Sequence, residues 1–128
     1  MRTKLALLTT VVALCAAIPV AAHHSITGEY DANKPVTVKG AVTKIEWTNP
    51  HARIYLDVTQ PDGKVTNWNI ELAAVSALVR AGWTSRSLKI GDVVTAEGLQ
   101  AKSGAPIANA RNVTFPDGRK VFSGAADN

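Results

Sequence analysis

Apolar and polar residues alternate over short stretches of the chain, the period expected of β-strands with one buried face. The clearest stretch is 52–58, where Ala52, Ile54, Leu56 and Val58 occupy every second position. Turn signals rich in proline, aspartate and glycine separate these stretches. The pattern predicts five strands, at 36–48, 52–58, 65–72, 93–99 and 107–115. A short additional strand is allowed at 121–122.

The first predicted strand changes parity along its length. Val38 and Val42 share one parity, whereas Ile45 and Trp47 share the other. A strand cannot exchange faces without a bulge or a bend, and Gly40 is a suitable place for one. A long, bent first strand is what a small closed barrel needs in order to turn a corner.

The period changes to that of a helix over 73–81, and Gly82 follows as a C-terminal cap. Five strands with a short helix between the third and fourth match a small five-stranded OB-like barrel. The alternative, an open β-sandwich, usually needs about seven strands. We therefore predict a mainly β fold, with an N-terminal arm at 23–35, the barrel at 36–122 and a disordered tail at 123–128.

The first 22 residues are typical of a signal peptide. Arg2 and Lys4 precede an apolar run, and cleavage after Ala22 fits the small-residue rule. The alternative is a transmembrane anchor, but the run is short for a span of about 20 residues. The only cysteine, Cys15, lies inside this leader, so the mature chain has no thiol. We expect a periplasmic or secreted protein.

The charge of the mature chain limits the classes of partner that we expect. Cleavage after Ala22 removes two of the fourteen basic residues and leaves twelve against ten acidic ones. The remaining basic residues form no continuous run. Since nucleic-acid binding requires a basic stripe or patch, we expect no nucleic-acid partner. We also expect no membrane contact after signal cleavage.

The three histidines carry the main chemical hypothesis. His23 and His24 would begin the mature chain, and His51 follows Pro50 in the first turn. A terminal histidine offers its α-amine and a ring nitrogen to one metal ion. A further histidine nitrogen completes a set that suits Cu(II). The hypothesis is a copper site at His23, His24 and His51. The alternative is a solvated terminal pair and a histidine that only caps a turn.

A second hypothesis is a metal-free module that binds a ligand or a protein. Trp47, Asn49 and Arg53 surround the same turn, and OB-type barrels bind ligands on such a face. The competing interpretation of Trp47, and of Trp68 and Trp83, is core filling, because tryptophan buries a large area.

Catalysis has little support in the sequence. The mature chain has no cysteine, no Gly-x-Ser-x-Gly motif and no phosphate-binding glycine loop. Glu46 is close enough in sequence to be a carboxylate partner of His51, although an exposed strand carboxylate is the simpler interpretation. We expect a binding protein rather than an enzyme, and a copper-dependent oxidase ranks last.

These motifs together resemble a family of small exported bacterial proteins known only as a domain of unknown function. The resemblance covers the mature chain, and the segments that carry it include Ala22-His23-His24-Ser25, Glu46-Trp47-Thr48-Asn49-Pro50-His51-Ala52, Leu78-Val79-Arg80-Ala81-Gly82-Trp83 and Pro116-Asp117-Gly118-Arg119. It implies export and a single β domain, and it carries no catalytic role. The chain departs from the family pattern at Arg53, where an aromatic residue is common, and at Ala74-Val75, where Ser-Pro is common.

Overall fold

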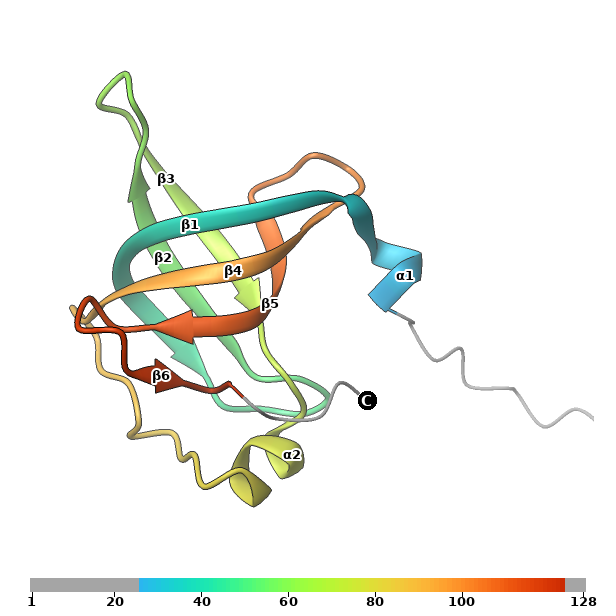
Figure 1. The fold of residues 1–128 in the computed structure, drawn as a ribbon, viewed down its shortest axis with the longest axis vertical. Coiled ribbons are helices and arrows are strands. Elements are labelled where there is room, and N and C mark those ends of the chain that lie inside the picture. The colour runs from blue at the N-terminus through green and yellow to red at the C-terminus, as the bar shows by residue number, and fades with distance from the viewer. Residues whose placement is uncertain (1–25, 124–128) are drawn as a thin grey trace, which may run out of the picture.

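The computed structural model describes residues 26–123, and about half of these lie in one mostly antiparallel sheet (Figure 1). The elements in chain order are α1 (Ile26–Glu29), β1 (Tyr30–Glu46), β2 (Arg53–Thr59), β3 (Val65–Glu71), α2 (Val75–Arg80), β4 (Val93–Ala101), β5 (Ile107–Thr114) and β6 (Lys120–Val121).

The sheet closes into a barrel. Its strand order is β3-β2-β1-β4-β5-β6, and a parallel pairing of β3 with β5 joins the two sides. Five principal strands with α2 between β3 and β4 confirm the predicted OB-like barrel. The short strand β6 is added at the edge of β5.

β1 serves both halves of the barrel because it bends. Its first part pairs with β4, from Pro35 to Ala41, and its last part pairs with β2, from Ala41 to Glu46. The register shifts between Val42 and Lys44, so the predicted parity change is present, just beyond Gly40. Gly40 is required by close approach, since a Cβ there would overlap the carbonyl oxygen of Asp57 on β2.

The barrel interior holds the apolar residues of the alternating stretches. Ile54, Leu56 and Ile70 are fully buried, and Trp68 is 9% exposed. Three aromatic rings pack together against this core. Trp47 packs on Phe122 with centroids 5.8 Å apart, and Trp83 packs on the same ring at 6.2 Å. The tryptophans therefore contribute to packing, although Trp47 and Trp83 stay half-buried.

The ends of the domain differ from the predicted bounds. β1 begins at Tyr30, so residues 30–35, assigned to the arm, belong to a strand, and a single helical turn, α1, precedes it. Ser123, assigned to the tail, has its hydroxyl 3.3 Å from the backbone nitrogen of Val113. The leader, His23 and His24 lie outside the described residues. Within residues 26–123, no helix is long and apolar enough to cross a membrane.

Candidate functional site

The candidate site is built around a carboxylate on the outside of the barrel. Trp68 and Ile70 point into the core, so the alternation of β3 places Asn69 and Glu71 on the outer face. The side chain of Glu71 is nevertheless only 5% exposed. A carboxylate removed from water needs charged or hydrogen-bonding partners.

Three side chains provide these partners. The guanidinium of Arg53 lies 2.6 Å from Oε2 of Glu71, and the hydroxyl of Tyr30 donates to the same oxygen at 2.7 Å. Nδ1 of His51 lies 3.1 Å from Oε1. Arg53 also donates to Oδ1 of Asn69 at 3.0 Å. We call these five residues the Glu71 cluster.

Strand register explains why Arg53 and Glu71 meet. They are direct partners across β2 and β3, so their side chains leave the same face. The row continues on both sides, because Glu46 of β1 is opposite Arg53 and Asn109 of β5 is opposite Glu71. Asn109 is 7% exposed. A row of alternating charge, ending in a buried amide, thus crosses four strands.

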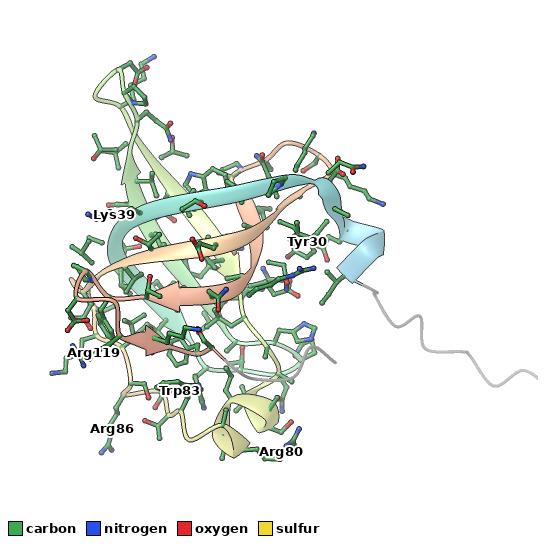
Figure 2. The ribbon with its side chains drawn as sticks, in the orientation of Figure 1. Tyr30, Lys39, Arg80, Trp83, Arg86 and Arg119 are labelled. Carbon is green, nitrogen blue, oxygen red and sulfur yellow. The ribbon has the colours of Figure 1, made fainter. Side chains whose placement is uncertain are left out.

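Tyr30 brings the start of the described chain to this row. It is 2% exposed, and its backbone pairs with Ala101 at the end of β4. Burial raises the pKa of the Tyr30 hydroxyl well above its ordinary value, and the hydrogen bond to Glu71 raises it further. The hydroxyl therefore remains protonated and acts as a hydrogen-bond donor to Glu71. Figure 2 shows Tyr30 at the side of the barrel where α1 joins β1.

His51 approaches the carboxylate from the loop between β1 and β2. The Asn49-Pro50 peptide bond immediately before it is cis. The His51 side chain is 27% exposed, so the ring lies partly in solvent while Nδ1 faces Glu71. The ring is therefore held at one nitrogen.

The predicted site residues are only partly brought together. His51 and Arg53 meet through Glu71, whereas Trp47 packs on Phe122 and Asn49 is exposed in the turn. Glu46 is not the carboxylate partner of His51. It accepts a hydrogen bond from the hydroxyl of Tyr55 at 3.2 Å and forms an ion pair with Lys44. The carboxylate partner of His51 is Glu71.

The sequence interpretation missed Tyr30, Asn69, Glu71 and Asn109. One signal for Glu71 was available. The turn between β2 and β3 is centred on Asp62, so residues equally distant from it, such as Arg53 and Glu71, face each other. No local pattern pointed to Tyr30, because its contact with Glu71 depends on closure of the barrel.

Metal ligands are sparse in the part of the chain that the structure describes. No group of three histidine, cysteine, aspartate or glutamate side chains there is arranged to hold a metal ion. His23 and His24, the other two residues of the copper hypothesis, lie outside the described residues.

Comparison with known proteins adds a family and structures of similar fold. The sequence matches a family of unknown function, DUF6152, over residues 11–109. No curated protein matches the chain. The mitochondrial single-stranded DNA-binding protein Rim1 of S. cerevisiae is 10% identical, with a TM-score of 0.49 over 67% of this chain and 97% of that one. The N-terminal domain of PriB from Thermoanaerobacter tencongensis is 20% identical, with a TM-score of 0.43 over 65% of this chain and 96% of that one. The expectation of no nucleic-acid partner stays a prediction.

Proposed function

We propose that this chain, which belongs to the DUF6152 family, is an exported protein that binds Cu(II) through His51 and the histidines at the start of its mature form. The observation that carries the proposal is the 3.1 Å contact between Nδ1 of His51 and the buried carboxylate of Glu71. The function is one of binding rather than catalysis.

This contact prepares the imidazole of His51 as a ligand. An ionised carboxylate can only accept hydrogen bonds, so Nδ1 of His51 must carry the proton. In the neutral ring, the lone pair then belongs to Nε2. Histidines that bind metals commonly donate their other N–H to a carboxylate, which fixes the ring and makes the ligating nitrogen more basic. Glu71 is suited to this role because Arg53 and Tyr30 hold its other oxygen.

The path of the chain supports participation by the N-terminal histidines. The hydroxyl of Tyr30 and the ring of His51 contact the two oxygens of one carboxylate. His24 precedes Ile26, the first residue of α1, by two positions, and each residue spans at most about 3.6 Å. Only one residue therefore separates His24 from α1, the helical turn that leads directly into Tyr30.

The ligand types favour copper. Cleavage after Ala22 gives His23 a free α-amine beside its imidazole, and these two nitrogens can chelate one ion. With Nε2 of His51 they make a three-nitrogen set, and such sets bind Cu(II) near the top of the divalent series. Copper bound there would be held in a fixed place on the barrel rather than on a free peptide.

The test is a Cu(II) titration of protein exported and processed by a bacterial host, with its N-terminus checked by intact mass. We expect tight one-to-one binding. His51→Ala and a form with one extra residue before His23 should each bind more weakly. Glu71→Gln should lower the affinity about 10- to 100-fold, because the ring of His51 loses its partner. The matched control, Glu46→Gln, should bind like the parent.

Three results would contradict the proposal. Binding sensitive only to the extra residue would indicate a terminal chelate that does not use His51. Binding no tighter than that of a peptide with the sequence of residues 23–28 would exclude a folded site. A processed mass that still includes the leader would exclude export with cleavage after Ala22.

A metal-free binding module is the second candidate, and the exposure of Arg53 favours it. Arg53 keeps 27% of its side chain exposed while Glu71 beneath it is buried, and Asn49 is exposed in the preceding loop. This alternative makes Trp47, Asn49 and Arg53 the contact residues. Ligand binding that Trp47→Ala abolishes and that replacement of His23 and His24 leaves unchanged would favour it over copper.

A further inference from the structure

The net charge of the described residues is concentrated in two segments of the chain, 75–93 and 115–120. Outside the segments 75–93 and 115–120, residues 26–123 contain seven lysines and arginines against seven aspartates and glutamates. The two segments contain five basic residues against two acidic ones. They therefore account for the whole net positive charge of residues 26–123, and we call them the basic end.

Trp83 connects the first segment to residues 122 and 123, which follow shortly after the second segment. Its ring packs edge-on against Phe122, and its Nε1 donates to the carbonyl oxygen of Ser123 at 3.1 Å. Figure 2 shows Arg80 and Arg86 at the lower end, where Trp83 also lies, and Arg119 higher on the left side. Arg80 and Arg86 of the first segment therefore lie at this end of the barrel.

The cations of the first segment are available to a partner. Arg80, Arg86 and Lys89 are all exposed. Within residues 26–123, none of the three forms an ion pair. By contrast, Arg119 in the second segment is neutralised by Asp117, 2.6 Å away.

Exposed apolar side chains accompany these cations. Four large hydrophobic residues of residues 26–123 are exposed, and three of them belong to the basic end. Val79 is 56% exposed, Ile90 63% and Val93 40%. Figure 1 shows that α2 and the segment leading from it to β4 project from the end of the barrel. A projecting surface with cations and apolar side chains fits a broad, flat partner.

We propose that the basic end docks the protein onto the surface of a membrane that contains anionic phospholipids. Unpaired lysines and arginines are attracted to such a surface, and apolar side chains among them can enter the headgroup region. The inference departs from the expectation of no membrane contact after signal cleavage. It does not depend on copper binding.

The docking should be weak and electrostatic. Each lysine or arginine near an anionic surface contributes roughly a fivefold increase in binding. Removing Arg80, Arg86 and Lys89 together should therefore reduce binding on the order of 100-fold. Salt should weaken it too, because surface charges are screened within about 10 Å at 0.1 M ionic strength.

The experiment is sedimentation of the mature protein with vesicles of phosphatidylglycerol and phosphatidylcholine in equal parts, compared with vesicles of phosphatidylcholine alone. One variant combines Arg80→Gln, Arg86→Gln and Lys89→Gln. The control combines Lys34→Gln, Lys39→Gln and Lys64→Gln, which removes the same charge outside the basic end. Circular dichroism checks that both variants are folded.

We expect the parent and the control variant to sediment with the anionic vesicles at low salt, and the basic-end variant to stay in solution. Equal losses in the two variants would overturn the proposal, since net charge alone would then explain the binding. Sedimentation with phosphatidylcholine alone to the same extent, or no sedimentation of the parent, would also overturn it. Binding of the parent to soluble polyglutamate but not to vesicles would assign the basic end to an acidic polypeptide instead.

Discussion

The outer face of the barrel carries the same chemical trio twice, once buried and once exposed. In each trio a tyrosine hydroxyl donates to a glutamate that also contacts a basic side chain. The buried trio is Tyr30, Glu71 and Arg53, and the exposed trio is Tyr55, Glu46 and Lys44. The tyrosine hydrogen bond is 2.7 Å long in the first and 3.2 Å in the second. The glutamate side chains are 5% and 31% exposed, respectively.

The comparison shows that exposure to water, rather than the kinds of side chain present, decides how much such a trio contributes to stability. Around Glu46, water competes with every contact, so the ion pair adds little to stability. Around Glu71, the charge has been taken out of water and each partner becomes necessary, because a buried charge left unpaired is costly. The buried trio is also the one that holds His51.

The largest expected effect is that of neutralising the buried glutamate. Glu71→Gln leaves the guanidinium of Arg53 without its counter-charge, and we expect a loss of about 3 kcal/mol in the free energy of unfolding. Urea unfolding followed by circular dichroism measures it. Glu46→Gln is the matched control and should leave the midpoint nearly unchanged. Similar losses in the two variants would show that burial does not distinguish the trios.

The next effect is that of removing one hydroxyl from each trio. Tyr30→Phe keeps the ring and removes a hydrogen bond to a buried charge, so we expect a loss of about 2 kcal/mol. Tyr55→Phe should cost clearly less, since its bond to Glu46 is longer and more exposed. The same unfolding experiment compares them. A larger loss for Tyr55→Phe would contradict the idea that burial makes the hydrogen bond of Tyr30 the more important of the two.

Alkaline titration should show that Tyr30 ionises at a higher pH than an ordinary tyrosine. Burial and Glu71 raise the pKa of Tyr30 in the folded protein. Its stabilising contribution is therefore fully present below the ordinary tyrosine pKa of about 10 and is lost as pH rises toward the folded value. Absorbance at 295 nm should show a late ionisation phase that Tyr30→Phe lacks. The idea fails if the parent and the variant both complete their ionisation near the ordinary value.

The smallest effect belongs to the exposed trio. The hydrogen bond from Lys44 is the largest cause that lowers the pKa of Glu46 from its ordinary value of 4.5. Its contribution is present above the ordinary pKa and is lost as pH falls through the lowered one. Carbon NMR of the side-chain carboxyl should show a midpoint below 4.5 that Lys44→Gln moves back toward it. An unchanged midpoint in that variant would mean that the pair with Lys44 does not form in solution.

The strands were predictable because their signals are local. Alternation at 52–58 and the turn at Pro61-Asp62-Gly63 each need only a few neighbouring residues to be recognised. The parity change after Val42 was equally visible, and it corresponds to the register shift in β1. Gly82 likewise predicted the end of α2, and the structure places it at positive φ just beyond the helix.

The site was less predictable because its contacts connect distant parts of the chain. Tyr30 and Glu71 are separated by 41 positions, and their hydrogen bond exists only when β1 has wrapped around the barrel. The sequence suggested Glu46 as the carboxylate partner of His51 because the two residues are near each other in the chain. Glu46 at the end of β1 instead accepts a hydrogen bond from Tyr55 of β2, while His51 contacts Glu71.

The two-sided pairing of β1 has a consequence for how the protein acquires its structure. β1 and β2 are neighbours in the chain, so they can pair early in folding. The pairing of β1 with β4 instead joins positions such as Val36 and Gly98, which are far apart in the chain. Contacts between distant positions slow folding, because a long loop must close before they form. A chain that emerges with its N-terminus first therefore has its earliest strand half-unpaired until β4 arrives. That temporary free edge is where the incomplete chain is most open to pairing with another strand.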